Sequence, residues 1–210
     1  IDKNAYERNK EAVHNENKYV FNCMNTDKIC IFTDTGKMHT IKAVDIPLGR
    51  FRDKGTPVDN LSNYDSSQER MLYVAPVGQL RSDRLLFVTK TSMCKLVEGA
   101  EFDVAKRTIA STKLADEDEL IFIGSASEME QIVLQSHGGC FLRFLTQEVS
   151  TMKKTALGVR GMKLADDDYL EHAYLLAGHQ EYTISYHDKE YALNKVRLAK
   201  RDTKGIKPRI

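Results

Sequence analysis

A strand-and-turn pattern that recurs four times constrains this chain more than any other feature of its sequence. Each copy is a short run rich in β-branched and aromatic residues that ends at a tight turn. The copies lie at 29–36 (ICIFTDTG), 85–92 (LLFVTKTS), 132–138 (IVLQSHG) and 182–188 (YTISYHD). Their turns follow one another at intervals of 56, 46 and 50 residues. Periods in this range are typical of arrays of small repeated sheets, such as propeller-like blades.

The residues after each copy also recur in a fixed order. A second strand is expected first, at 37–42, 93–97, 140–145 and 190–197. A basic, turn-prone segment follows, at 49–61, 105–114, 152–164 and 200–210. A polar or acidic stretch then leads into another apolar strand, as at 115–124 and 165–176. This order predicts an all-β fold of about four four-stranded antiparallel blades.

The repeats favour one continuous domain over residues 1–210. Its blades are expected at roughly 16–64, 65–118, 119–168 and 169–210. Residues 1–15 are interpreted as the tail of a preceding repeat, and because the chain begins at Ile1 we expect it to be a piece of a longer polypeptide. Within this tail, 6–15 holds few apolar positions, which favours an extended lead-in over a helix.

The four turns differ in how they reverse the chain. Gly36 supplies the positive φ that a hairpin turn needs, and the pair Gly138 and Gly139 does the same in the third copy. The second and fourth turns, KTSM and YHDK, must reverse without glycine. All four are expected to be β-hairpins.

Composition excludes several classes of protein. The chain is 41% hydrophobic and has no apolar run near 18 residues, so no membrane span is predicted. The four cysteines form no CxxC pair and are expected to be small core residues of a protein in a reducing cytoplasm. The six histidines are scattered, and His172, His179 and His187 lack i, i+4 spacing. Neither a disulfide framework nor a metal site is favoured.

The charges are segregated along the sequence although their sum is only +1. Residues 150–163 hold four lysines and arginines without an acid, and 195–209 hold seven against Asp202 alone. Acids cluster instead at 116–119 and 166–168. If each repeat places its basic segment at the same position, the cations follow one edge of the array and the acids face another surface. Such an edge fits the backbone of a nucleic acid.

No catalytic motif accompanies these repeats. The sequence has no GxxxxGK[ST] loop, no GxSxG elbow, no HExxH and no EF-hand spacing. The acidic pairs Asp116/Asp118 and Asp166/Asp168 share one place in the repeat, where a solvated connection is commoner than a metal site. We therefore expect no enzyme, metal or cofactor in this chain. A protein-interaction propeller that uses a disc face is the alternative function, and an enzyme with a central pocket is a third.

Duplex DNA is favoured over a single strand as the partner. Gly and Thr in the basic segments expose backbone N–H groups, and the flanking Lys and Arg supply charge without reading bases. Binders of single strands stack bases on aromatic side chains. The basic segments hold no such platform apart from Phe51.

At this point the residues resemble a known family. The segments TALGVRGMKLADDDYL (155–170) and KICIFTDTGKMHTIKAVDIP (28–47) resemble the repeat of the C-terminal domain of bacterial type IIA topoisomerase A subunits, which include those of DNA gyrase and topoisomerase IV. The resemblance implies a β-pinwheel whose blades exchange strands and whose basic rim bends duplex DNA. It also implies an upstream breakage and reunion domain with the active-site tyrosine, a separate ATPase B subunit, and a nucleoid-associated location in the bacterial cytoplasm.

The resemblance also implies which residues touch DNA. Carried over by position, the rim residues are Arg50, Arg52, Lys54, Lys106, Arg107, Lys113, Lys153, Lys154, Arg160, Lys163, Lys200, Arg201, Lys204 and Lys207. Two departures from the family pattern are visible. The glycine-rich gyrase box is not found, since RNKEA at 8–12 occupies the nearest position, and this favours a topoisomerase IV-like subunit. Family wheels have five or six blades, so about four blades imply a truncated or open wheel.

Overall fold

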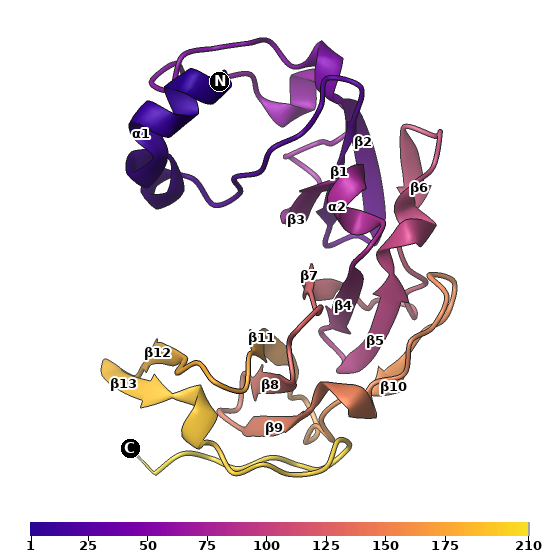
Figure 1. Cartoon of the computed structure of the whole chain (residues 1–210). Helices are drawn as coiled ribbons and strands as arrows, with labels where there is room; N and C mark the ends of the chain where they lie inside the picture. The colour runs from indigo at the N-terminus through magenta and orange to yellow at the C-terminus, as the bar shows by residue number, and fades with distance from the viewer. Residues whose placement is uncertain (210) are drawn as a thin grey trace.

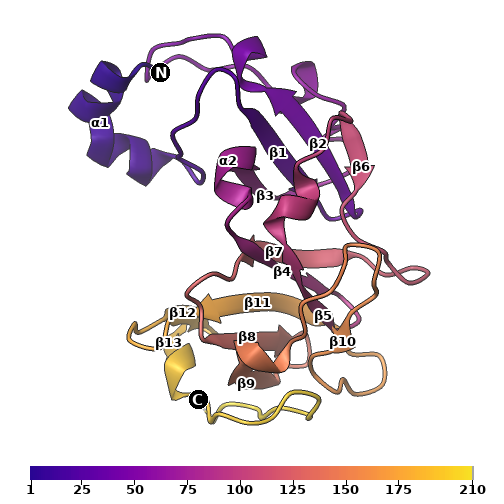
Figure 2. The same ribbon diagram turned by 45° about the vertical axis from the view of Figure 1, so that its right-hand side comes forward.

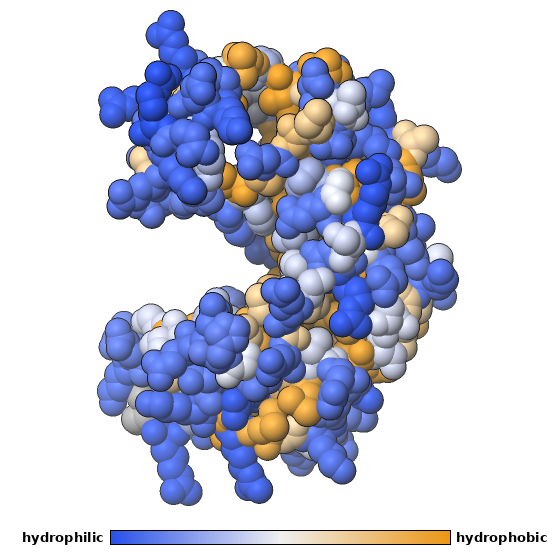
Figure 3. Space-filling model, viewed as in Figure 1, coloured by the Kyte–Doolittle hydropathy of each residue, from blue (hydrophilic) through white to orange (hydrophobic). Residues whose placement is uncertain are grey.

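Four antiparallel sheets follow one another along an open arc (Figure 1). The structure is a computed structural model that describes residues 1–209; Ile210, at the end of the last basic segment, lies outside them. The two ends of the chain lie at opposite ends of the arc, and Figure 2 shows the same arrangement from a second direction. The space-filling view keeps the opening between the two ends, so side chains do not close it (Figure 3). The predicted propeller-like array of sheets is confirmed, as an open wheel.

The sheets are here numbered one to four along the chain. Sheet one has the strand order β3 (Met71–Pro76), β1 (Lys28–Thr33), β2 (Lys37–Lys42) and β6 (Thr108–Ala110). Sheet two has the order β10 (Val159–Arg160), β5 (Met93–Glu98), β4 (Arg84–Thr89) and β7 (Leu120–Ser125). Sheet three has the order β11 (Leu170–Leu176), β8 (Gln131–Ser136) and β9 (Phe141–Leu145). Sheet four is the hairpin of β12 (Thr183–Tyr186) and β13 (Lys189–Ala192).

Each of the first three sheets is built from two successive repeats. The central hairpin comes from one repeat, and the outer strands, two in sheets one and two and one in sheet three, come from the next. Sheet one thus combines β1 and β2 with β3 and β6, which follow them in the chain. This is the strand exchange that the family resemblance implied. The expected segment 16–64 supplies strands to sheet one alone, whereas 65–118, 119–168 and 169–210 each divide their strands between two sheets.

The number of strands per sheet differs from the expectation in the second half of the arc. Sheets one and two have four strands each, as predicted, whereas sheet three has three and sheet four has two among the described residues. An isolated antiparallel bridge between Phe141 and Ile206 marks the fourth position in sheet three. The outer strand is reduced there to a single pair.

The hairpins form for the local reasons that the sequence suggested. Gly36 has φ +76° in the turn between β1 and β2, and Gly139 has φ +83° between β8 and β9. In the turns without glycine, Ser92, His187 and Asp188 take up the positive φ themselves. The central strands are buried on both faces, which explains why β1 and β4 are apolar along most of their length.

The core lies between neighbouring sheets. After each hairpin the chain makes a 3₁₀ turn, at η1 (Ala43–Asp45), η3 (Gly99–Phe102), η4 (Thr146–Glu148) and η5 (Leu193–Lys195); η2 (Val58–Asn60) and the short helix α2 (Val77–Leu80) complete the connections. Phe102, at the end of η3, packs its ring edge on Phe32 of the preceding sheet with centroids 4.9 Å apart. Val149 and Val196, after η4 and η5, are buried in the same way. Each repeat therefore covers the sheet before it.

Backbone hydrogen bonds also join neighbouring sheets at their turns. The N–H of Leu120 in β7 donates to the carbonyl of Asp34 at 2.9 Å, and that of Leu170 in β11 donates to Lys90 at 2.9 Å. The acids of the lead-in segments serve the turns as well. Asp118 accepts from the N–H and hydroxyl of Thr91, and Asp168 accepts from the N–H of Gly138. Asp118 and Asp168 therefore stabilise the turns of the preceding sheets. The sequence had led us to expect only that they lie in a solvated connection.

The helix α1 (Lys3–Glu16) is the main departure from an all-β chain. The expectation of an extended lead-in over 6–15 is wrong. Asp2 caps the helix by accepting a hydrogen bond from the N–H of Ala5 at 2.8 Å, and Val13 is buried. The low count of apolar residues led to the wrong prediction, because Val13 is the one residue of this helix that is buried.

Candidate nucleic-acid interface

Three of the four basic segments occupy the same place in the fold. Segment 105–114 contains β6, which pairs with β2, and segment 152–164 contains β10, which pairs with β5. Segment 200–210 bridges to β9 through Ile206. The first two therefore add the outermost strand to a sheet and the third adds a single bridge at the same position, on the convex side of the arc (Figures 1 and 2).

These three segments, here called the rim loops, are also linked to one another by their backbones. The N–H of Lys113 donates to the carbonyl of Lys154 at 3.1 Å, which joins the first rim loop to the second. The N–H of Lys163 donates to Thr203 at 2.9 Å, and the N–H of Asp202 donates to Gly161 at 2.7 Å, which join the second to the third. The rim loops thus form one continuous band along the convex side.

The band carries exposed cations from all three loops. Those that are exposed and have no ion pair among residues 1–209 are Lys106, Arg107, Lys113, Lys163, Lys200, Lys204, Lys207 and Arg209. Lys153 is also exposed but lies 3.4 Å from a carboxylate oxygen of Glu101. Lys154 and Arg201 are half-buried.

The expectation that acids face a separate surface is wrong for three residues, because Glu101, Glu148 and Asp202 lie among the rim loops. Asp202 pairs with the guanidinium of Arg160 through two hydrogen bonds of 2.5 and 3.1 Å, and hydrogen bonds from Arg160 lower the pKa of its carboxyl. Glu148 holds Arg201, whose guanidinium also donates to the carbonyl of Arg160. Arg160 and Arg201 are thereby committed to partners within the protein.

The structure does not bring the first basic segment, 49–61, together with the other three. No strand of the described sheets comes from it, and its only regular element is η2. Arg50 and Lys54 line a cavity of about 820 Å³ together with Tyr6 of α1. Arg50, Arg52 and Lys54 are exposed, but they lie at the N-terminal end of the arc beside α1. Segment 49–61 follows its hairpin in the sequence as the other basic segments do, but in the structure it does not lie beside them.

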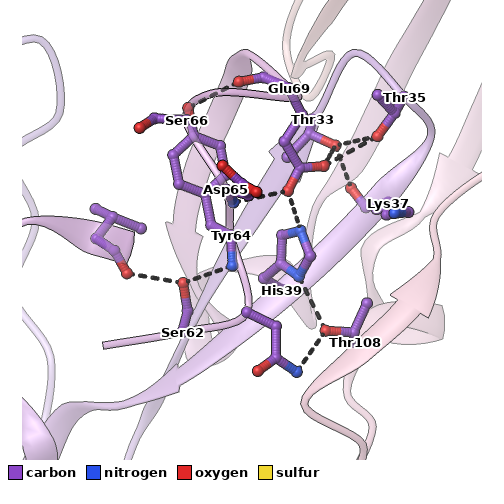
Figure 4. A network of polar contacts seen from close by, with 12 residues as sticks. Thr33, Thr35, Lys37, His39, Ser62, Tyr64, Asp65, Ser66, Glu69 and Thr108 are labelled. Carbon is purple, nitrogen blue, oxygen red and sulfur yellow. Dashed lines mark hydrogen bonds and ion pairs between the residues drawn. The ribbon is translucent and has the colours of Figure 1, made fainter. Parts of the chain in front are cut away.

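A buried polar network lies between sheet one and the segment before β3 (Figure 4). The sequence did not predict it. Glu69 accepts hydrogen bonds from the hydroxyls of Thr33 and Thr35 and contacts Nε2 of His39 at 2.5 Å. Nδ1 of His39 contacts the hydroxyl of Thr108 in β6 at 2.9 Å. Burial would raise the pKa of Glu69, but these hydrogen bonds lower it.

This histidine–carboxylate pair could suggest catalysis, but its surroundings argue for a structural role. The side chains of His39 and Glu69 are only 2% and 4% exposed. The network ties the outer strand β6 to the hairpin, so it fixes the first rim loop. The sequence shows His39 on the strand face that carries Lys37 and Ile41, and nothing in it points to Glu69 as the partner of this histidine.

The remaining side chains offer little other chemistry. Among residues 1–209 no group of three His, Cys, Asp or Glu residues could hold a metal ion. Cys30 and Cys94 are buried as expected, Cys140 is half-buried, and the expectation of a core residue is wrong for Cys23, which is exposed. Within the described part of the chain, no helix has the length and apolar character to cross a membrane.

Comparison with protein families adds an independent finding. A family profile described as "DNA gyrase C-terminal domain, beta-propeller" matches residues 27–66, 83–127 and 130–177. The gyrase A protein of Ureaplasma parvum serovar 3 is 27% identical over 184 residues, which cover 85% of this chain and 22% of that protein. The gyrase A protein of Salmonella typhimurium is 31% identical over 144 residues, which cover 68% and 16%. The chain thus spans about a fifth of the length of these relatives.

Solved structures show the same fold. The C-terminal domain of DNA topoisomerase IV is similar with a TM-score of 0.79 and 22% identity, over 98% of this chain and 67% of that one. The DNA gyrase A C-terminal domain is similar with a TM-score of 0.64 and 22% identity, over 88% and 60%. The relatives found by sequence are named gyrase, whereas the higher of these two TM-scores belongs to topoisomerase IV.

Proposed function

The chain belongs to the DNA gyrase C-terminal domain family of beta-propellers, and from this premise we propose that it binds duplex DNA along the rim loops and bends it. The observation that carries the proposal is the backbone linkage of the three rim loops, through Lys113 to Lys154 and Lys163 to Thr203. A continuous band holds its cations at fixed separations on a convex surface. A duplex that follows such a surface must bend, and phosphate contacts supply the free energy for this without reading sequence.

In this proposal the domain is not itself catalytic. It presents a DNA segment to the breakage and reunion domain of the same polypeptide, and it works with a topoisomerase B subunit that hydrolyses ATP. These partners, and a location in the bacterial cytoplasm at the nucleoid, rest on the family and on its bacterial relatives. The missing gyrase box favours a role closer to that of topoisomerase IV than to tight wrapping by gyrase.

Salt dependence of DNA binding tests the proposal directly. Six of the unpaired cations of the rim loops are Lys106, Arg107, Lys113, Lys163, Lys204 and Lys207. If each neutralises one phosphate, the logarithm of the binding constant falls with the logarithm of salt concentration at a slope of about −5. Binding to a duplex of random sequence, followed by fluorescence anisotropy between low and moderate salt, measures this slope. A slope near zero, or tighter binding to a single strand, contradicts the proposal.

A matched pair of triple variants separates the rim loops from general charge. Replacing Lys113, Lys163 and Lys204 by glutamine should reduce the magnitude of the slope by about 3. The same change at Lys3, Lys10 and Lys18, which are equally exposed but lie at the N-terminal end of the chain, removes the same charge and should leave the slope nearly unchanged. Equal losses in both variants would show that DNA does not follow the rim loops.

A protein-interaction role is the second candidate, and one observation favours it. Met24, Val44 and Leu48 are 68%, 66% and 78% exposed, and the backbone hydrogen bond from Ala43 to Asp27 places their segments next to each other. Exposed apolar patches mark interaction surfaces when they are contiguous. This candidate predicts no retardation of linear duplex DNA in a gel, whereas the DNA-binding proposal predicts a clear shift.

A further inference from the structure

The second rim loop is held at one residue, Lys154, through both its N–H and its carbonyl group. The N–H of Lys154 donates to Oε2 of Glu101 at 3.0 Å. The carbonyl of Lys154 accepts from Nζ of Lys95 at 2.8 Å and from the N–H of Lys113 at 3.1 Å. Nζ of Lys95 also donates to the carbonyl of Ala156 at 2.7 Å. The backbone from 154 to 156 is therefore fixed by a carboxylate and an ammonium group.

Lys95 is a charged residue in a buried position, which is unusual for lysine. It stands in the middle of β5, is only 1% exposed, and has its ammonium 5.6 Å from the centre of the Phe87 ring. Burial lowers its pKa to about 8, against a smaller opposite effect of Glu101. Burying an ammonium group is unfavourable unless hydrogen bonds compensate it. Both of its hydrogen bonds go to the second rim loop, so holding that loop is the role that its position serves.

Both carboxylate oxygens and the backbone carbonyl of Glu101 contact the second rim loop. One carboxylate oxygen of Glu101 accepts from the N–H of Lys154, and the other lies 3.4 Å from Nζ of Lys153. The backbone carbonyl of Glu101 accepts from Nζ of Lys154 at 3.4 Å. Glu101 lies in η3, between strand β5 of sheet two and the first rim loop. An acid is therefore placed inside a surface that otherwise carries cations.

The next repeat uses the same device. Glu148 lies in η4, accepts from the N–H of Arg201 at 2.9 Å through Oε2, and accepts from Nε of Arg201 at 3.0 Å through its carbonyl. The separation of 53 residues between acid and loop is the same in both cases. Glu101 and Glu148 occupy the same place in successive repeats, and each binds the backbone of the rim loop 53 residues later. This indicates a recurring arrangement and not a chance ion pair.

We propose that Glu101 and Glu148, together with Lys95, are positioning residues for DNA binding. They fix the backbone of the second and third rim loops so that the neighbouring cations face the duplex at set separations. This inference rests on the proposed function, and it gives these acids a favourable effect on DNA binding in spite of their charge. Preorganisation of this kind improves affinity because less freedom is lost when the complex forms.

The proposal reverses the sign expected from charge alone. If Glu101 were only an acid near the DNA, removing it would relieve repulsion with phosphates and binding would tighten. If Glu101 holds the loop, removing it frees residues 153–156 and binding weakens. Glu98, three residues earlier, is exposed and has no side-chain hydrogen bond among residues 1–209, so it provides the control for charge.

The experiment compares Glu101→Ala, Glu148→Ala and Glu98→Ala in the chain of residues 1–210, each of which loses one negative charge. Affinity for a random duplex is measured by fluorescence anisotropy at fixed salt, and amide hydrogen exchange is followed at residues 153–156 and 200–203. We expect Glu98→Ala to bind as tightly as the wild type or more tightly. We expect Glu101→Ala and Glu148→Ala to bind about fivefold more weakly, which corresponds to the net contribution of one typical hydrogen bond per loop, with faster exchange in the affected loop.

The outcomes separate this inference from the proposed function. If the wild type does not bind duplex DNA, the proposed function is wrong, and hydrogen exchange alone then decides whether the acids hold the loops. If the wild type binds and Glu101→Ala and Glu148→Ala behave like Glu98→Ala in both measurements, the positioning role is refuted. Lys95→Met serves as a further variant, since it keeps the volume, removes both hydrogen bonds to the loop, and should weaken binding without changing any exposed charge. Circular dichroism verifies that each variant is folded.

Discussion

A single methyl group at Gly158 should detach an outer strand and its rim loop from sheet two. Gly158 precedes β10 and has φ +107°, and a Cβ built there would lie 2.6 Å from the carbonyl oxygen of Cys94 in β5. That oxygen belongs to the backbone of a central strand, so it cannot move aside without disturbing the sheet. Gly205, at the equivalent place in the third rim loop, has φ +72° and would meet the carbonyl oxygen of Phe141 at 2.7 Å. The close approach is thus a repeated feature of the strand exchange.

The expected loss follows from two effects. A positive φ costs a non-glycine residue about 1 kcal/mol. The clash displaces β10, which pairs with Met93 and Cys94 over two residues, and losing its hydrogen bonds removes about 2 kcal/mol more. Gly158→Ala should therefore lower the free energy of unfolding by about 3 kcal/mol, or lower Tm by about 6 to 12 °C for a chain of this length.

Two control variants isolate the effects. Gly55 has φ +70° but no atom within 4 Å of its Cβ position, so Gly55→Ala should lose only about 1 kcal/mol. Gly78 lies in α2 with a free Cβ position and no positive φ, so Gly78→Ala should be neutral or slightly stabilising. Urea unfolding of the three variants gives the comparison. Equal losses for Gly158→Ala and Gly55→Ala would refute the clash, and DNA affinity unchanged in a destabilised Gly158→Ala would argue against the rim loops.

Two further predictions concern buried groups. The pKa of Glu69 lies below its ordinary 4.5, so its stabilising effect is complete above that pH and is lost as the pH falls through the lower value in the folded state. Acid should therefore reduce the stability of the wild type more than that of Glu69→Gln, which urea unfolding at pH 7 and pH 3.5 measures; equal pH dependence would contradict the network of Figure 4. Burial raises the pKa of Cys30 and of Cys94 to about 12, whereas Cys23 is exposed. Mass spectrometry after brief alkylation of the native protein should find Cys23 modified first, and rapid labelling of Cys94 would show that sheet two opens.

The hairpins and their turns could be predicted because their causes are local. Short runs of β-branched and aromatic residues, a turn residue that accepts positive φ, and the return of the same pattern about every 50 residues identify a strand–turn–strand unit without knowledge of its neighbours. The basic segments after each hairpin were found in the same way. The helix α1 was missed because its cap at Asp2 and its one buried residue, Val13, do not stand out in a polar stretch.

The sequence by itself determined that this protein is an array of small sheets with a basic segment in every repeat. Only the tertiary structure decided which hairpin each outer strand joins, since β6 pairs with β2 across more than sixty intervening residues. It also decided that Arg160 is paired with Asp202, that Glu101 grips a rim loop, and that Lys95 is buried beneath it. Periodicity reports how each residue relates to its neighbours along the chain, whereas strand partners and ion pairs depend on residues that folding brings together from distant repeats.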